Sequence, residues 1–590
     1  MSVPTIRIGI HRYYQFPTHR MLSRTHFLCC AFFATLLGSS AQGQGVFQEF
    51  LGDNANDSMG NAFALGDVNG DGTPDYIVGM RNAFDGSLIT GGVRVYSGAN
   101  LAILHTFYGT RSGGGFGFAV DFAGDTDGDG FGDILVGAPF HQESGEILNG
   151  RAFLYSGQTG SLLFEIGGAG FFDNAGFAVS RAGDLNGDSL PDFLVGSPGA
   201  DTGAPDTGSA TAYVGTTGLP LYSIDGLSAG DLLGSSLASL GDLNLDGFDD
   251  FAIGIRGTDI NGSGSGSVTV YSGQTGLDMY TRDGTVAGQA MGFSLAHAGD
   301  LDGDGHMDWI TGSPQDPRSG TQAGSAQIYS GLSGVLLHEI LGQTDFERLG
   351  EGVSTAGDVD GDGFDDFLIG APGDSTIDVD AGRLTAYSGS SGSPLCQTYG
   401  VLASDRLGLG VGPAGDFNGD GIPDVLLGVP GDDKAANNSG AFLLLAGCRA
   451  AGSTYCGPSA LNSSGQSAAI SGQGSTTAGD HQLVLVAQFM SQNQFGYFLV
   501  ATQPGLLQNP GGSQGDLCLA GSLGRFNGPA QIRNSGLSGS FQLEVDLTSL
   551  PLSPTQAVLA GETWQFQAWY RDQNPGNTSN FTDALAISFL

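Results

Sequence analysis

The stretch Gly357-Asp358-Val359-Asp360-Gly361-Asp362-Gly363-Phe364-Asp365-Asp366-Phe367-Leu368-Ile369-Gly370-Ala371-Pro372 decides how the rest of the chain is interpreted. Its first half is an acidic loop of the form Asp-x-Asp-x-Asp-Gly-x-x-Asp, and its second half is a short apolar run that stops at Gly-Ala-Pro. Carboxylates at alternate positions of a loop favour a calcium ion, which takes oxygen ligands. A short apolar run bounded by turn residues is typical of a buried strand.

The same pattern recurs at a fixed spacing through most of the chain. The first aspartates of the loops are Asp67, Asp125, Asp184, Asp242, Asp300, Asp358 and Asp416, so successive copies lie 58, 59, 58, 58, 58 and 58 residues apart. A fixed period of this size indicates a repeat architecture. The sequence therefore predicts seven units, which together span residues 46–447.

Each unit has the pattern of four short strands, as the second unit illustrates. The strands expected there are Phe116–Val120 before the acidic loop, Ile134–Val136 after it, Arg151–Tyr155, and Leu162–Ile166 beyond the turn Ser-Gly-Gln-Thr-Gly. Glycine-containing turns between short apolar runs indicate β-hairpins. Four antiparallel strands repeated seven times predict an all-β fold with a seven-bladed β-propeller.

These residues resemble FG-GAP repeats, the blades of the integrin α-chain N-terminal propeller and of related secreted proteins. All seven acidic loops match, whereas the "FG" half is Phe116-Gly117 in one unit and Leu-Gly in others, such as Leu349-Gly350. The "GAP" half is lost in the first unit (Gly79-Met80-Arg81) and in the fourth (Gly254-Ile255-Arg256). The resemblance implies a protein or carbohydrate ligand that binds loops on the face away from the acidic loops.

The strand pattern also predicts how the ring closes. An outer-strand pattern occurs once before the first unit, at residues 47–51, and the seventh unit ends on its third strand. Because an open ring leaves an unpaired edge, we expect the strand at 47–51 to complete the last blade.

Seven structural calcium ions, one per loop, are expected. Positions one, three, five and nine would supply side-chain oxygens, and position seven its carbonyl oxygen. The predicted ligands are Asp67, Asn69, Asp71, Thr73 and Asp75; Asp125, Asp127, Asp129, Phe131 and Asp133; Asp184, Asn186, Asp188, Leu190 and Asp192; Asp242, Asn244, Asp246, Phe248 and Asp250; Asp300, Asp302, Asp304, His306 and Asp308; Asp358, Asp360, Asp362, Phe364 and Asp366; and Asp416, Asn418, Asp420, Ile422 and Asp424.

The loops differ from one another in two ways that bear on affinity. Four loops have Asn at position three, which keeps an oxygen but loses a charge, so we expect these loops to bind calcium less tightly. Ser189 replaces the glycine at position six of the third loop, where a sharp bend is needed, so this site should be the poorest. An EF-hand is the alternative interpretation, but it requires Glu at position twelve, where these loops have apolar residues such as Val136.

Composition and the N-terminus indicate an exported protein. The chain has 60 acidic and 20 basic residues and a net charge of −40, which argues against a nucleic-acid partner. Residues 25–38 form an apolar run preceded by Arg20 and Arg24, and small residues follow it. This pattern predicts a signal peptide at residues 1–41, in which residues 1–20 could be a misassigned start, and no later run is long enough to span a membrane.

The rest of the chain predicts a second, smaller domain. Residues 448–480 are expected to hold a linker and a first strand, and residues 481–590 a C-terminal β-sandwich, because alternating runs such as Phe541–Leu547 and Trp564–Arg571 indicate half-buried strands. After removal of the leader four cysteines remain, and we favour the pairs Cys456–Cys518 and Cys396–Cys448 among three possible pairings. Trp569 either stacks on a sugar or packs under a loop.

The favoured function is non-catalytic adhesion or binding of a protein or carbohydrate, by a secreted or cell-surface protein. Candidate contact loops are 81–90, 199–208 and 256–264. The alternatives are a propeller-scaffold enzyme, such as a polysaccharide lyase or hydrolase, and a structural component of the cell envelope. The one compact acid–base group, His141 with Glu143 and Glu146, is better explained as a solvated loop.

Overall fold

The computed structural model describes residues 46–142, 148–419, 421–447, and 453–588 apart from 456–467, 474–482, 489, 492, 508–509, 511–512, 515, 529–530, 537–539, 560 and 573–577. The predicted leader, Cys448 and Cys456 lie outside these residues. The elements of the described residues are all strands. No helix among these residues is long and apolar enough to cross a bilayer.

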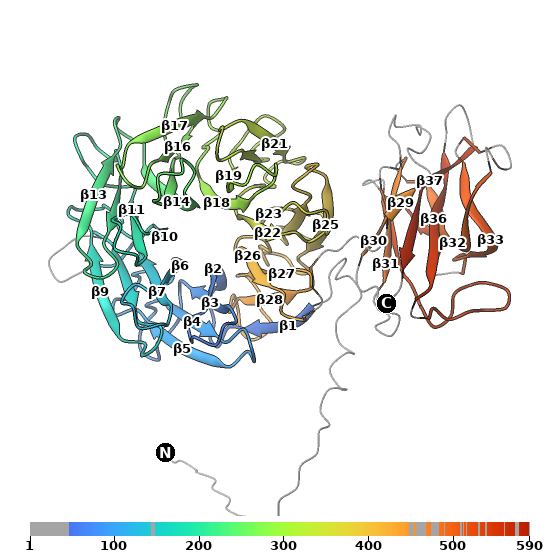
Figure 1. Ribbon diagram of the computed structural model, residues 1–590, viewed down its shortest axis with the longest axis horizontal. Helices are drawn as coiled ribbons and strands as arrows, with labels where there is room; N and C mark the ends of the chain where they lie inside the picture. Colours follow the sequence, from blue (N-terminus) through green and yellow to red (C-terminus); the bar gives the residue numbers. More distant parts are fainter. Residues whose placement is uncertain are drawn as a thin grey trace, which may run out of the picture. The chain divides into compact units, whose positions relative to one another are not determined.

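Seven four-stranded antiparallel sheets follow one another along the chain and form the blades of a ring, with one strand of each blade next to the axis (Figure 1). This confirms the predicted seven-bladed β-propeller. The innermost strands are β2 (Met59–Gly66), β6 (Ala119–Gly124), β10 (Ala178–Gly183), β14 (Leu233–Gly241), β18 (Ser294–Gly299), β22 (Val353–Gly357) and β26 (Val411–Gly415). The second strands are β3 (Asp75–Met80), β7 (Asp133–Ala138), β11 (Asp192–Ser197), β15 (Asp250–Ile255), β19 (Asp308–Ser313), β23 (Asp366–Ala371) and β27 (Asp424–Val429).

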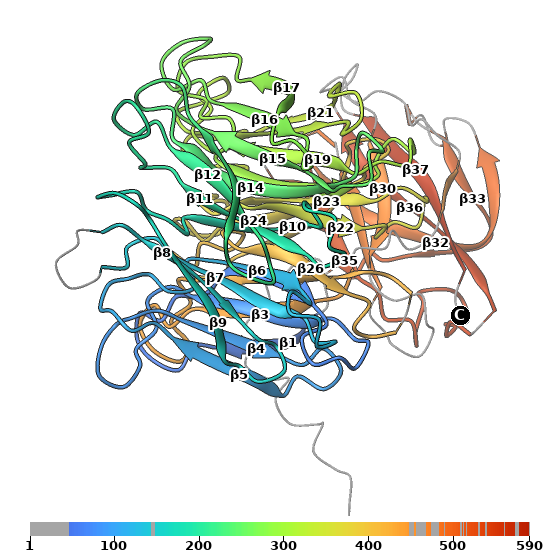
Figure 2. The same cartoon turned by 60° about the vertical axis from the view of Figure 1, so that its left-hand side comes forward.

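The two outer layers of strands complete the blades, and Figure 2 shows several of them from a second direction. The third strands are β4 (Gly92–Tyr96), β8 (Arg151–Tyr155), β12 (Ser209–Tyr213), β16 (Ser267–Tyr271), β20 (Ser325–Tyr329), β24 (Arg383–Tyr387) and β28 (Ala441–Leu445). The outermost strands are β5 (Ile103–Tyr108), β9 (Leu162–Gly167), β13 (Pro220–Asp225), β17 (Asp278–Asp283), β21 (Leu336–Leu341), β25 (Pro394–Tyr399) and β1 (Val46–Leu51).

The innermost strand of the second blade begins later than the sequence suggested. It starts at Ala119 rather than Phe116, because Gly117 takes a positive φ of 81° and forms part of the turn that precedes the strand. A Cβ atom on Gly117 would come within 2.1 Å of the carbonyl oxygen of Gly92, so this position has room only for glycine.

The ring closes as predicted, because β1 pairs antiparallel with β28 and becomes the outermost strand of the seventh blade. Its Phe50 ring stacks on Phe442 of that blade at 4.3 Å and lies 4.9 Å from Tyr96 of the first blade. Buried apolar residues fill the space between each pair of neighbouring blades, and the cluster around Met59, Tyr76 and Phe442 does so between the seventh blade and the first. Burial of these side chains is the main force that holds the blades together.

The C-terminal part is a β-sandwich, as predicted. One sheet contains β29 (Ser453–Tyr455), β37 (Thr578–Ser588), β36 (Thr563–Asp572), β32 (Phe495–Leu507), β33 (Leu517–Arg525) and β34 (Arg533–Asn534). The other contains β30 (Ala469–Gln473), β31 (Val484–Gln488) and β35 (Phe541–Glu544). Both sheets contribute to one core, in which Leu485 and Leu543 of the small sheet join Phe498, Phe566 and Leu585 of the large sheet. Two of these strands, β29 and β30, come from the range 448–480.

Candidate metal loops

Each acidic loop joins the innermost strand of a blade to the second strand, as between β6 and β7. The strands of a blade run antiparallel, so the loops from the first to the second strand and from the third to the fourth strand open on one face of the propeller. The loops from the second to the third strand and from one blade to the next open on the opposite face. We call the face with the acidic loops the acidic face. We call the opposite face the arginine face, because it carries Arg81, Arg256, Arg348 and Arg406.

The aspartate at position one organises each loop by accepting backbone hydrogen bonds. In the second loop, Asp125 accepts from the N–H groups of Gly128 at 2.8 Å, Asp129 at 3.0 Å and Gly130 at 2.9 Å. At position five, Asp129 accepts a bond of 2.9 Å from the N–H of Phe131. These bonds fold the loop back on itself, so that its acidic side chains converge.

In three loops the carboxylates come close enough together to hold a metal ion. Within each of these loops, one carboxylate oxygen from each of three aspartates lies within 4.8 Å of the other two. The three groups are Asp125, Asp127 and Asp133; Asp300, Asp302 and Asp304; and Asp358, Asp360 and Asp366. Because Ca²⁺ is a hard cation that takes oxygen ligands, these all-oxygen clusters fit the ion.

These three loops are the loops that have Asp rather than Asn at position three. In the first, third and fourth loops the asparagine amide donates to the aspartate at position nine, for example from Asn69 to Asp75 at 3.1 Å and from Asn244 to Asp250 at 3.4 Å. In the third loop Asn186 reaches both oxygens of Asp192 at 3.1 Å. An amide N–H therefore offsets charge in these loops, whereas only carboxylates meet in the other three.

The aspartate at position nine has a structural role that sequence reasoning missed. It is buried in every blade and accepts one bond from the N–H at position two and another from a glycine in the turn between the third and fourth strands. In the fifth blade, Asp308 accepts from Leu301 at 2.8 Å and from Gly331 at 2.9 Å. The glycines that fill this role are Gly98, Gly157, Gly215, Gly273, Gly331, Gly389 and Gly447.

A signal for this link is present in the sequence, because the seven glycines recur at one place in the repeat. A Cβ atom on Gly331 would lie 1.9 Å from the carbonyl oxygen of Met307, and a Cβ atom on any of the other six glycines would lie 1.8–2.2 Å from the equivalent carbonyl oxygen. Only glycine therefore allows the turn to reach the carboxylate at position nine.

Burial raises the pKa of these carboxyl groups. The pKa of Asp308 and of Asp366 rises to about 7, and that of Asp133, Asp192 and Asp250 to about 6. Desolvation is the largest cause, neighbouring carboxylates add to it, and the backbone N–H donors oppose it. A bound cation would favour the charged form of each group.

The remaining predicted ligands are placed as follows. In six loops the residue at position seven donates its backbone N–H to the aspartate at position five. These residues are Thr73, Phe131, Leu190, Phe248, His306 and Phe364. Ser189 adopts a φ of 70°, so the third loop keeps the bend that glycine makes elsewhere. In the seventh loop, Asp416 accepts from Gly419 and Gly421, and Asp420 lies outside the described residues.

Of the acid–base group considered from the sequence, the structure describes His141 alone. His141 is 2% exposed and packs edge-on against Phe153 at 5.7 Å, and Glu143 and Glu146 lie outside the described residues. Trp569 packs against Tyr497 with ring centres 5.0 Å apart, which agrees with the packing role.

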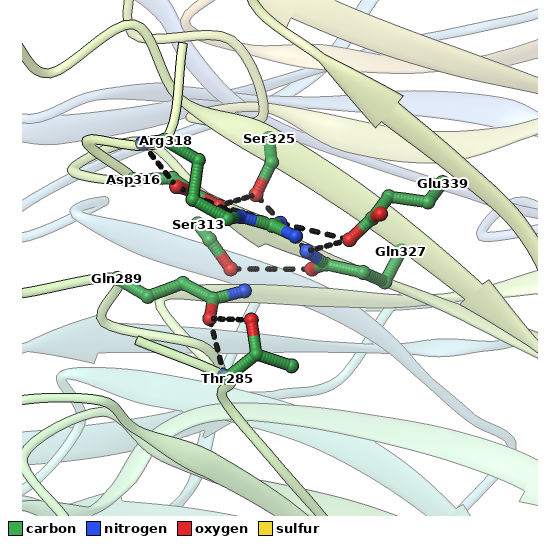
Figure 3. Close-up of polar contacts among 8 residues, drawn as sticks. All are labelled: Thr285, Gln289, Ser313, Asp316, Arg318, Ser325, Gln327 and Glu339. Atoms are coloured by element: carbon green, nitrogen blue, oxygen red, sulfur yellow. Dashed lines mark hydrogen bonds and ion pairs between the residues drawn. The ribbon is translucent and has the colours of Figure 1, made fainter. Parts of the chain in front are cut away.

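A hollow of about 560 Å³ opens on the arginine face at the fifth blade, lined by Gly288, Gln315, Pro317, Gly320, Thr321, Gln322 and Asp345. The polar side chains near this hollow form hydrogen bonds and ion pairs with one another (Figure 3). Arg318 pairs with Asp316 at 2.7 Å and with Glu339 at 2.8 Å, and Gln289 accepts a bond of 2.6 Å from the N–H of Thr285. Asp345, the one titratable lining residue, accepts from the N–H of Thr321 at 2.7 Å. The lining therefore holds no acid–base pair.

Comparison with known proteins agrees with this architecture. The FG-GAP repeat family matches residues 116–148, 175–213, 291–329, 349–387 and 408–445. Similar proteins include integrin alpha-V of Gallus gallus, which is 28% identical over 215 residues and covers 34% of this chain and 20% of that protein. Integrin alpha-4 of Xenopus laevis is 32% identical over 192 residues, with 30% and 18% covered, and integrin alpha-5 of Xenopus laevis is 27% identical over 267 residues, with 43% and 20% covered.

The chain thus matches about a fifth of the length of each of these relatives. The matched segments fall within the propeller and contain acidic loops of the kind described above. The chain is therefore an integrin-α-like FG-GAP repeat protein.

Proposed function

We propose that this protein is an exported, calcium-binding and non-catalytic propeller that mediates adhesion by binding an extracellular protein or carbohydrate. The observation that carries the calcium part is the convergence of three carboxylates, within 4.8 Å, in the second, fifth and sixth loops. Each loop would hold one ion through the residues at positions one, three, five, seven and nine. The ion would join the innermost strand of a blade to its second strand and so stabilise the propeller.

Calcium fits these loops better than a transition metal does. The side chains that converge are carboxylates and amides, without a histidine ring or thiol among the groups identified in the described residues. Ligand sets made only of oxygen atoms suit Ca²⁺ and Mg²⁺. A loop that offers five ligand positions suits Ca²⁺ better, because Ca²⁺ takes more ligands and accepts a less regular geometry.

We expect the ligand to bind the arginine face because the loops of the two faces differ. The acidic face would be occupied by metal loops with a fixed geometry. The loops at 81–90, 199–208 and 256–264 lie on the opposite face and vary in sequence between blades. Loops held by a rigid scaffold are where binding residues concentrate.

Two observations support a non-catalytic role. His141 is buried against Phe153, and the hollow at the fifth blade has Asp345 as its one titratable lining residue. The integrin α relatives also favour a binding protein over an enzyme.

Export is supported by the apolar run at residues 25–38 and by the cysteines. Cys396 and Cys518 are both disulfide-bonded. We assign them to the pairs Cys396–Cys448 and Cys456–Cys518, and we assign the propeller to residues 46–447 and the sandwich module to residues 481–590, with a strand-bearing connection between them.

The function is tested by incubating the mature chain with arrays of extracellular proteins and glycans, with calcium and with excess chelator. Binding that requires calcium is the expected result. Turnover of polysaccharides by the purified chain, or the absence of any ligand on both arrays, would contradict the proposal.

A further inference from the structure

Two blades depart from the repeat at the same place, and both departures introduce an arginine. The residue that ends the Gly-x-Pro motif after the second strand is Pro139, Pro198, Pro314, Pro372 or Pro430 in five blades. In the first and fourth blades it is Arg81 and Arg256. Because the repeat places these two arginines equivalently, both lie on the arginine face.

Arg256 is accommodated by aromatic rings. Its guanidinium lies 5.1 Å from the ring centre of Phe177 in the third blade and 5.7 Å from that of Phe293 in the fifth blade. Both contacts are within the range of cation–π attraction. This arginine therefore has partners from both neighbouring blades.

Arg81 has no such partners among the described residues, where its guanidinium makes no hydrogen bond, ion pair or aromatic contact. Its backbone N–H donates to the side chain of Asn61 at 2.9 Å, and its side chain is half-buried. Burial lowers the pKa of Arg81, the positive charge of Arg406 lowers it further, and the negative charge of Glu351 opposes both. A half-buried cation that makes no hydrogen bond or ion pair is costly, and a bound anion would offset that cost.

The surroundings of Arg81 carry an excess of positive charge. Arg348 pairs with Glu351 at 2.5 Å. Burial raises the pKa of the Glu351 carboxyl group, and the positive charges of Arg348, Arg406 and Arg81 oppose that rise. The Glu351 side chain is 9% exposed, and its Oε2 atom has no hydrogen-bond partner. The Glu351 carboxylate thus faces the positive charge of three arginines, on a chain whose net charge is −40.

Apolar surface adjoins this positive group. Asn61 links Arg81 to the second blade, because its amide donates to the carbonyl oxygen of Phe118 at 3.1 Å. The Phe118 ring lies 5.7 Å from that of Phe140, which is 38% exposed. Arginine and exposed aromatic rings together are the residue types that are enriched where proteins bind one another.

We propose that Arg81 and Arg406 bind the carboxylates of an acidic segment of a protein partner, with Phe118 and Phe140 contacting apolar side chains of the same segment. This deepens the proposed function and rests on it, since it names the chemistry of the ligand and its site. Guanidinium groups match carboxylates in geometry and form charge-assisted hydrogen bonds with them. A basic partner would be attracted without specificity to the acidic surface of this chain. An acidic partner is instead attracted to the place where arginines gather, which gives specificity.

The test uses the full mature chain with calcium and measures fluorescence anisotropy of a labelled peptide of Glu-Glu-Leu repeats. We expect the wild-type chain to bind it, and binding to weaken with rising salt. The variant Arg81→Gln/Arg406→Gln should bind at least about tenfold more weakly. The variant Arg525→Gln/Arg533→Gln, which removes two exposed charges from the sandwich, should bind like the wild type.

Two measurements on the wild-type chain keep the test independent of how the variants fold. The Gln-Gln-Leu counterpart of the peptide should not bind, and polygalacturonate should bind more weakly than the acidic peptide. Failure to bind the acidic peptide, equal loss in both double variants, or preference for polygalacturonate would overturn the proposal. Calcium-dependent binding on the arrays that survives in Arg81→Gln/Arg406→Gln would leave the proposed function standing and remove this inference alone.

Discussion

The second and fourth blades have the same fold and nearly the same loop, yet the loops differ in how they manage charge. In the second loop Asp127 lies beside Asp125 and Asp133, with one oxygen of each within 4.8 Å of the other two. In the fourth loop the equivalent Asn244 donates its amide N–H to Asp250 at 3.4 Å. A carboxylate or an amide at position three thus separates a loop in which three carboxylates converge from a loop in which an amide N–H bonds to one of them.

Removing metal should have the largest effect. We expect excess chelator to lower the melting temperature of the chain markedly, because converging carboxylates repel one another without a cation. A site at a calcium concentration 100-fold above its dissociation constant contributes about 2.7 kcal/mol to stability. Calorimetry with chelator, and again after excess calcium is restored, measures this effect. An unchanged melting curve in chelator would mean that the loops do not hold structural metal.

Deleting the carboxylate at position nine should have the next largest effect. Asp308→Ala leaves the buried N–H groups of Leu301 and Gly331 without their acceptor, which we expect to cost about 3 kcal/mol of unfolding free energy. Urea unfolding in calcium measures the loss, and part of it should persist in chelator. Asp278→Ala, at an exposed position on β17, is the control. Equal stability of the two variants would show that the buried carboxylate does not join the loop to the turn.

Exchanging the residues at position three sharpens the comparison between the two loops. Asp127→Asn should weaken calcium binding by about tenfold and stabilise the metal-free chain, because affinity follows the number of charged ligands and an amide can bond to Asp133. Asn244→Asp should change both quantities in the opposite direction. Calcium titration and melting in chelator measure the pair. Shifts of the same sign in both variants would contradict the role given to position three.

The pH dependence should be a smaller effect, and it has opposite signs with and without calcium. The pKa of Asp308 and Asp366 is about 7 in the folded, metal-free chain, against an ordinary value of 3.8 for this side chain. The folded state then binds more protons than the unfolded state between these values, so metal-free stability rises as pH falls and is lost as pH rises through 7. Calcium affinity should fall over the same range, because protons compete for the carboxylates. A melting temperature in chelator that decreases steadily from pH 8 to pH 5 would contradict the raised pKa of Asp308 and Asp366.

The repeat made most of the fold predictable, because each blade has the same strand order and the extra strand β1 had an evident place beside β28. Strands β33 and β37 were not predicted. Glycines such as Gly521 interrupt β33, and polar and apolar residues do not alternate regularly along either strand. The acidic residues of the loops were predictable from spacing alone.

Other features of the site depend on distances that spacing does not give. Sequence reasoning treated the aspartate at position nine as a ligand and did not see its bonds to position two and to the glycine turn, as between Asp308 and Gly331. Nor did it see that Arg81 and Arg406, far apart in the chain, lie near one another and near Glu351. Both depend on how neighbouring elements pack across the repeat.

The most direct test is native mass spectrometry of the mature chain after equilibration with calcium and transfer to metal-free buffer. We predict up to seven bound calcium ions per chain, with those of the second, fifth and sixth loops retained longest, because these are the loops in which three carboxylates of the described residues converge. Replacing Asp125, Asp300 and Asp358 together by alanine should remove the ions that are retained longest. A chain without bound divalent ions, or retention unchanged in the triple variant, would contradict the account.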